Sequence, residues 1–180
     1  MDTIDVVLDK SPDGNPYYHN IHLIINNEKV NGVFDVIRFI TSFIAFKKVD
    51  TELLTCSCGN AGCAGIFYGT TIKIRKHSVE WRDIDCGFSK KFYSFNIHQY
   101  KSVVRKAYQL VYNIALDTSN YNKEDDGDYY NPFYPTSING LDRSMNYYTG
   151  TRYVDVCVKY YNAIALSPDK IKERKQKCVL

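Results

Sequence analysis

The stretch NIHQYKSVVRKAYQLVYNI, residues 96–114, has the clearest helical pattern in the chain and is the key to its fold class. Asn96 and Gln99 stand at the spacing of a capping box, in its less common asparagine form. Apolar side chains then recur at helical spacing, at Ile97, Tyr100, Val104, Ala107, Val111 and Ile114. The stretch therefore predicts a helix that begins at Asn96 and buries one of its sides.

A second helix is predicted closer to the N-terminus. Its apolar residues fall on one helical stripe, formed by Val33, Ile37, Ile40 and Ile44 and widened by Phe34, Val36 and Phe43. We expect a buried amphipathic helix from about residue 32 to about residue 47.

The segments around these helices have the composition and alternation of strands. The candidates are TIDVVLD (3–9), NIHLIIN (20–26), IFYGTTIKIRKH (66–77), SVEWRDI (78–84) and KKFYSF (90–95). The third and fourth are expected to pair through a turn near Lys76, with Trp81 as a core residue. Because strands and helices do not alternate strictly, the sequence predicts an α+β fold, mostly antiparallel sheet with two main amphipathic helices.

The length favours one domain over residues 1–180. Its last part, residues 169–180, is a basic tail, which is expected to be a frayed end or a short exposed helix. The stretch DKIKERKQK, residues 169–177, has five basic and two acidic side chains and accounts for the whole net charge of +3. The rest of the chain is neutral in total. A neutral body does not favour general nucleic-acid binding, so we expect no direct nucleic-acid contact.

Location is predicted from the absence of apolar segments. No stretch is long and apolar enough to span a membrane, so we expect no membrane partner. Asp2 and Asp5 stand where a signal peptide has positive charge. The sequence therefore predicts a cytoplasmic protein, in which its six cysteines are mostly reduced.

The stretch CSCGNAGCAG, residues 56–65, brings Cys56, Cys58 and Cys63 together. Structural zinc usually takes four ligands in two C-x2-4-C pairs, a spacing that is absent here, although Cys86 or His77 would complete a set. A redox C-x-x-C is also missing. A tight turn, a metal site and a reactive thiol all remain open, and we expect the turn, without bound metal.

Glycines support the turn. Gly59 and Gly62 bracket two residues in a turn that needs positive φ, while Gly65 and Gly69 mark bulges or close approaches of the backbone.

This stretch also carries a resemblance. The string C-x-C-G-x-x-G-C-A-G at 56–65 resembles one found in small bacterial proteins, where it follows a helix and precedes a strand pair with V-x-W, here Val79 to Trp81. An F-x-x-x-Q-Y that opens a helix is similar too, here Phe95 to Tyr100. Some of these proteins are immunity proteins of contact-dependent growth inhibition and related polymorphic toxin systems. The resemblance covers about residues 20–115 and implies a toxin inhibitor.

The chain is polar and rich in tyrosine from Asp117 to Arg152, which predicts a long loop before a late strand at 151–166. Within it, four carboxylates precede paired tyrosines. The candidate partner-binding residues are Glu124, Asp125, Asp126, Asp128, Tyr129, Tyr130 and Tyr134. A solvated loop, an acidic docking surface and a calcium loop are the alternatives, and the acidic alternation of an EF-hand is missing.

No catalytic or nucleotide-binding motif such as G-x-S-x-G, a Walker loop or H-E-x-x-H occurs, and a Cys86–His98 nucleophile has no local support. The four histidines, His19 and His22 among them, are expected to lie on the surface or to be hydrogen-bonded to neighbouring groups.

We expect a non-enzymatic immunity protein without cofactor, whose partner is a cognate toxin domain. The alternative is a zinc-binding structural or regulatory module that uses Cys56, Cys58 and Cys63. If the acidic segment is not the interface, an exposed strand edge near residues 73–81 is the next candidate.

Overall fold

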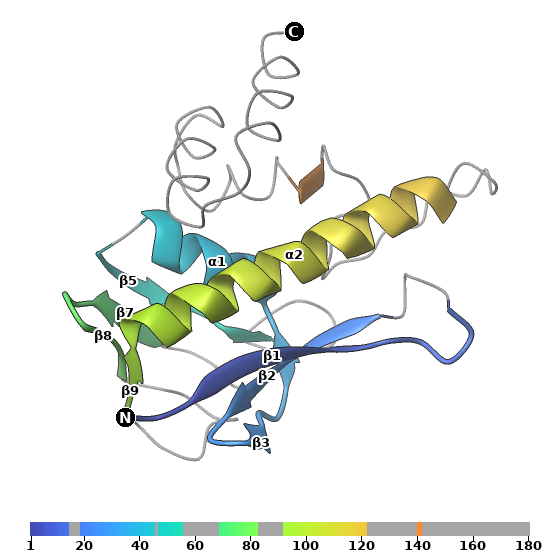
Figure 1. The fold of residues 1–180 in the computed structure, drawn as a ribbon. Helices are drawn as coiled ribbons and strands as arrows, with labels where there is room; N and C mark the ends of the chain where they lie inside the picture. Colours follow the sequence, from blue (N-terminus) through green and yellow to red (C-terminus); the bar gives the residue numbers. More distant parts are fainter. Residues whose placement is uncertain (15–18, 46, 56–68, 83–91, 122–139, 142–180) are drawn as a thin grey trace, which may run out of the picture.

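The computed structural model describes residues 1–14, 19–45, 47–55, 69–82, 92–121 and 140–141. These residues form two helices and antiparallel strand pairs, so the predicted α+β class is confirmed (Figure 1). The predicted strand at 151–166 and the tail at 169–180 lie outside the described residues.

The N-terminal sheet contains β1 (Ile4–Asp9), β2 (Asn20–Ile25) and β3 (Glu28–Lys29), in the order β1-β2-β3. Asn26 and Asn27 join β2 to β3 with φ of 52° and 67°. Two central residues with positive φ give the turn that matches the twist of a two-residue hairpin, and asparagine tolerates this conformation. The strand β3 was not predicted, because Glu28 and Lys29 have neither the apolar alternation nor the β propensity of a strand.

The second sheet contains β5 (Lys48–Thr51), β7 (Thr70–Ile74), β8 (Ser78–Arg82) and β9 (Phe92–Asn96), in the order β5-β7-β8-β9. The predicted pairing of β7 with β8 is confirmed. The prediction of an exposed edge near residues 73–81 is wrong, because β7 also pairs with β5 and β8 also pairs with β9. Their backbone hydrogen bonds are already used within the sheet.

Helix α1 (Val36–Ala45) begins later than predicted. Val33 and Phe34 form β4, which pairs with β6 (Leu54–Thr55), instead of the first helical turn. Asp35 then caps the helix, because its Oδ1 accepts a hydrogen bond from the Arg38 backbone N–H at 3.0 Å.

Helix α2 (Ile97–Tyr121) begins where the sequence predicted it. The Asn96 Oδ1 accepts hydrogen bonds from the backbone N–H groups of His98 at 2.8 Å and Gln99 at 3.3 Å. The prediction of irregular chain from Asp117 is wrong for residues 117–121, which are helical. These residues include neither glycine nor proline, and extending a formed helix needs no new nucleus.

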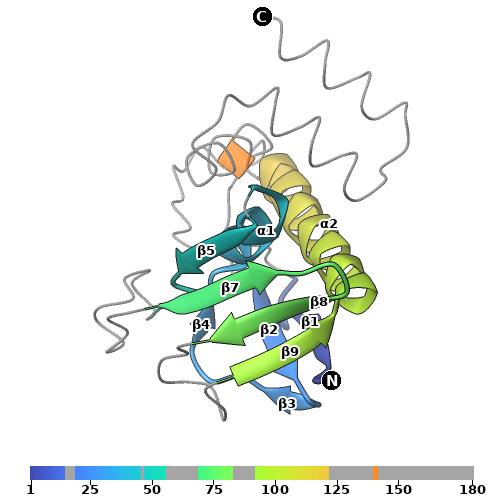
Figure 2. The same cartoon turned by 90° about the vertical axis from the view of Figure 1, so that its left-hand side faces the viewer.

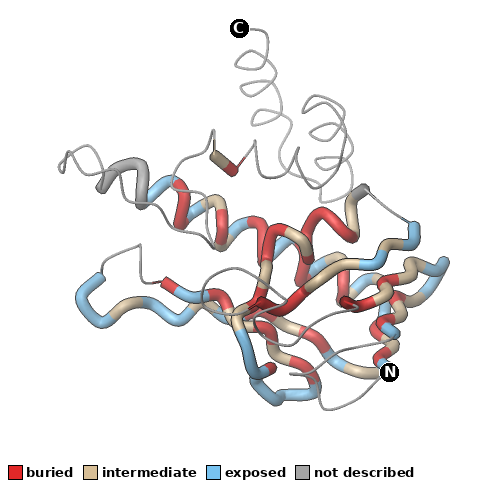
Figure 3. Tube along the Cα trace, turned by 180° about the vertical axis from the view of Figure 1, so that it is seen from behind, coloured by how far each residue is buried: buried red, intermediate tan, exposed pale blue. Residues whose placement is uncertain are grey.

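Both helices lie on the same side of the strands, and the core lies between the layers (Figures 1 and 2). Figure 3 shows buried positions recurring along α2 and alternating along the strands. Trp81 has no exposed surface, as predicted, and its ring contacts those of Phe95, Tyr100 and Phe39 at centroid distances of 5.1, 6.1 and 6.2 Å. Its Nε1–H donates to the Tyr100 hydroxyl at 3.2 Å, and burial raises the pKa of Tyr100.

The N-terminal residues connect the two sheets. The Asp2 backbone N–H donates to the Ser94 carbonyl at 2.8 Å, and the Ser94 N–H donates to Asp2 Oδ2 at 3.0 Å. The other carboxylate oxygen of Asp2 accepts a hydrogen bond from Asn26 Nδ2 at 2.9 Å. Asp2 thus joins β9 to the β2–β3 turn, immediately before the chain enters β1.

Candidate functional site

The candidate partner-binding residues, Glu124 to Tyr134, lie outside the described residues, but both attachments of their segment are described. On one side the segment follows Tyr121, the last residue of α2. On the other side the chain returns at Leu141, which is fully buried and belongs to the hydrophobic core. The acidic segment therefore connects two fixed points of the folded body.

Helix α2 fixes the first of these points. Its buried side chains recur three and four residues apart, from Tyr100 through Val104 and Val111 to Ala115, along the core. Leu116 is 41% exposed and Asp117 is exposed, so the two residues after Ala115 do not belong to the buried side of α2. From Ala115 to Tyr121 the helix continues for about 9 Å at about 1.5 Å per residue. The acidic segment follows directly after this last part of the helix.

The cysteine-rich residues 56–68 also lie outside the described residues, and their attachments are described too. Thr55 ends β6 and Thr70 begins β7, and both side chains are buried. Gly69 has a φ of 67°, and a Cβ at this position would lie 2.9 Å from the Thr51 carbonyl oxygen. The close backbone approach predicted at Gly69 is confirmed. Predictions for Cys56, Cys58, Cys63, Gly59, Gly62 and Gly65 fall outside the described residues.

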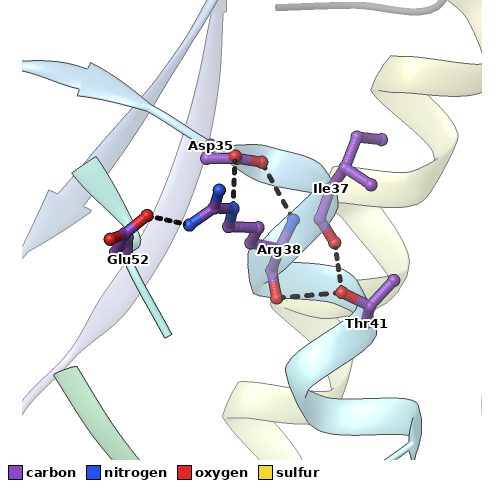
Figure 4. A network of polar contacts seen from close by, with 5 residues as sticks. All are labelled: Asp35, Ile37, Arg38, Thr41 and Glu52. Carbon is purple, nitrogen blue, oxygen red and sulfur yellow. Dashed lines mark hydrogen bonds and ion pairs between the residues drawn. The ribbon is translucent and has the colours of Figure 1, made fainter. Parts of the chain in front are cut away.

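A charged cluster lies where the chain leads into the cysteine-rich segment (Figure 4). Arg38 Nε lies 3.1 Å from Asp35 Oδ2, and Arg38 Nη1 forms an ion pair with Glu52 Oε2. The Asp35 backbone N–H donates to the Leu53 carbonyl at 2.9 Å. Burial raises the pKa of Asp35, and nearby Glu52 raises it further, against the opposing effect of Arg38.

This cluster fixes the start of α1 to the chain between β5 and β6. Its two carboxylates share one guanidinium, a pattern typical of a structural ion pair rather than of a reactive pair of carboxyl groups. Sequence reasoning did not single it out. The signal was Asp35, a residue type that caps helices, with Arg38 three residues later; it stood inside the predicted helical stripe, which began at Val33.

Each histidine that the structure describes either has a polar partner or is exposed to solvent. His19 is buried, and its Nδ1 accepts a hydrogen bond from the Ser11 N–H at 3.3 Å. His22 Nε2 lies 3.6 Å from Asp9 Oδ2, while burial and Lys29 lower the pKa of His22.

Within the ranges that the structure describes, no three His, Cys, Asp or Glu side chains come together as metal ligands. The described part of the chain also has no helix that is both long and apolar enough to cross a membrane.

Comparison of the chain with protein-family models, with curated proteins and with solved structures finds no match in any of the three. Its own residues and their placement are therefore the basis for inferring its function.

Proposed function

We propose that the protein is a non-enzymatic immunity protein, which binds a cognate bacterial toxin domain and neutralises it by covering its active site. The observation that carries this proposal is the acidic, tyrosine-rich segment between Tyr121 at the end of α2 and the buried Leu141. Because the acidic segment is attached to the fold at both ends, it should lose less conformational entropy on binding a partner than a free tail would.

The composition of the segment fits a basic partner. Glu124, Asp125, Asp126 and Asp128 supply negative charge, which speeds encounter with a basic surface. Tyr129, Tyr130 and Tyr134 supply contact area at a low entropic cost. The complementary partner is a toxin of the nuclease class, whose substrate channel is basic. The resemblance around residues 56–65 supports the same class of function, in the cytoplasm of a bacterium.

A zinc-binding module is the second candidate, supported by Cys56, Cys58 and Cys63 in one short segment. The buried Thr55 and Thr70 fix both ends of that segment, which would preorganise ligands carried by it. Metal analysis of protein purified without added zinc distinguishes the two candidates. Stoichiometric zinc, lost together with stability in Cys58→Ser, would favour the zinc module.

Toxin binding tests the first candidate. In one variant the four carboxylates are replaced by Glu124→Gln, Asp125→Asn, Asp126→Asn and Asp128→Asn. We expect the association rate constant to fall about 10-fold or more at low salt, with the difference shrinking as salt screens the charges. The exposed Glu28 provides the control, because Glu28→Gln removes a carboxylate from strand β3, outside the acidic segment.

The tyrosines are tested separately by Tyr129→Ala with Tyr130→Ala. Here the dissociation rate constant should rise, by about 30-fold for a loss of about 2 kcal/mol, because buried aromatic anchors dominate interface energies. Melting temperatures should change little in either variant. Unchanged affinity and unchanged protection of toxin-exposed cells in both variants would place the interface elsewhere.

A further inference from the structure

The outward face of the four-stranded sheet concentrates positive charge. Successive side chains of a strand point to opposite faces, and the buried Ile72, Val79 and Trp81 identify the inward one. Five basic residues stand on the outward side or in the turn at its end, and together we call them the basic sheet face: Lys48, Lys73, Arg75, Lys76 and Arg82. Of the acidic side chains that the structure describes, Asp50 and Glu80 lie on this face too.

No helix of the described residues covers this face, because α1 and α2 lie across the inward side (Figure 2). The side chains of Arg75 and Arg82 are 45% and 55% exposed. The basic sheet face is thus accessible in the described part of the molecule.

Much of this charge is not neutralised by the residues that the structure describes. Lys48 pairs directly with Lys73 across β5 and β7, an arrangement of like charges that is unfavourable on its own. Neither lysine forms an ion pair with any other residue that the structure describes. Glu80 contacts both Arg75, at 3.4 Å, and Arg82, at 3.2 Å, so one carboxylate serves two guanidinium groups. A bound polyanion would relieve the repulsion between the lysines.

An exposed aromatic ring lies beside these cations. Phe92, on β9 next to β8, is 45% exposed, and Arg82 lies over its ring at 5.2 Å from the centroid. A phenylalanine on a basic surface provides a face on which a nucleic-acid base can stack, with arginine adding a cation–π contribution.

We propose that the basic sheet face binds single-stranded nucleic acid, with Lys48, Lys73 and Arg75 contacting phosphates and Phe92 stacking against a base. A four-stranded sheet face suits an unpaired strand, whereas reading a duplex takes a helix or ribbon inserted in a groove. The exposed Phe92 favours nucleic acid over an acidic peptide. This inference does not rest on the proposed toxin-binding function, because it uses only residues of β5, β7, β8 and β9 and of the chain next to them.

The total charge of the chain gave no sign of this basic surface. The chain outside residues 169–177 is neutral in sum, which led us to expect no nucleic-acid contact. Basic residues gather on one sheet face because strand pairing brings β5, β7 and β8 together, while acidic residues such as Asp9 and Glu28 lie in the other sheet.

The test is fluorescence anisotropy of the full chain with a labelled single-stranded oligonucleotide of about 15 nucleotides, from about 50 to about 200 mM salt. The wild-type protein should bind, and increasing salt should weaken the binding. In Lys48→Gln with Lys73→Gln, the slope of log K against log salt should become shallower by about 1.4, which corresponds to two lost phosphate contacts.

Phe92→Ala should weaken binding by at least about five-fold and leave the salt slope unchanged, because stacking releases no counterions. The matched control is Lys101→Gln with Arg105→Gln, which removes the same charge from α2 and should leave binding as in the wild type. Failure of the wild-type protein to bind, or an equal loss in the control, would overturn the proposal. Equal competition by a polyglutamate peptide would overturn it in favour of an acidic protein partner.

Discussion

At the scale of single residues, Gly69 shows how a backbone position can require glycine for two reasons at once. Its φ of 67° lies in the left-handed region, which side chains other than Asn and Asp rarely adopt. Its missing side chain also leaves room for the Thr51 carbonyl oxygen, 2.9 Å from where a Cβ would stand. This close approach allows Thr70 to pair with Thr51 as soon as the cysteine-rich segment ends.

A pair of glycine variants separates these two reasons. Gly14 also has positive φ, 76°, but a Cβ there would meet nothing within 4 Å. Gly14→Ala should therefore lower the free energy of unfolding only by the conformational cost of about 1 kcal/mol. Gly69→Ala should cost more, about 2–4 kcal/mol, because the backbone must also move. Urea unfolding measures both, and equal losses would contradict a role for the contact with Thr51.

At the scale of elements, the start of α1 is set by competition between a helix and a strand pair. Val33 and Phe34 fit the helical stripe, yet they pair with Thr55 and Leu54 in β4–β6. Asp35 ends this strand and caps the helix, and its carboxylate also contacts Arg38. The raised pKa of Asp35 indicates that burial outweighs this contact.

This raised pKa gives the stability of the fold a defined pH dependence. Because the pKa of Asp35 in the folded chain lies above its ordinary value of 3.8, the folded chain binds the Asp35 proton more tightly than the unfolded chain does. The stability it contributes is present below that value and is lost as pH rises through the folded pKa. Relative to Asp35→Asn, which cannot ionise, wild-type stability should fall as pH rises from the ordinary pKa of 3.8 through the raised pKa of the folded chain. Denaturant unfolding at a series of pH values is the measurement.

Asp35→Ala is the comparison that isolates the cap. Asparagine caps a helix about as well as aspartate, whereas alanine does not, so Asp35→Ala should be about 1 kcal/mol less stable than Asp35→Asn. A wild-type protein that gains stability over Asp35→Asn with rising pH would show that the Arg38 ion pair dominates instead.

At the scale of the whole molecule, contacts between distant parts of the chain close the structure. Asp2 bonds to Ser94 and so links the N-terminal residues to β9. Lys106 Nζ on α2 reaches the Asp5 carboxylate on β1 at 2.8 Å. Leu141, beyond the acidic segment, has no exposed surface and packs into the core. Leu141 thus ties the chain on the far side of the acidic segment to the core.

Leu141→Ala should accordingly lower the free energy of unfolding by about 2–4 kcal/mol, because it leaves a cavity in the core. Leu116→Ala is the matched control, since Leu116 is 41% exposed on α2, and its loss should stay near 0.5 kcal/mol. Thermal or urea unfolding of the wild-type protein and of the two variants measures these losses. Similar values for both variants would show that Leu141 does not anchor the segment.

The sequence by itself determined the elements whose signals are local. Periodicity and Asn96 predicted where α2 begins, alternation predicted β1, β2 and the β7–β8 pair, and the apolar Trp81 was predicted to lie in the core. Such signals act within a few residues, so they can be read without knowing the fold.

Only the tertiary structure decided what depends on partners far away in the chain. Pairing with Leu54 and Thr55 turned Val33 and Phe34 from helix to strand, and pairing on both sides made β7 and β8 interior strands. The same pairing gathered the basic sheet face from β5, β7 and β8, although the chain outside its tail is neutral in total. Strand partners and core contacts are separated along the chain by distances that no local pattern records, which is why these features could not be predicted.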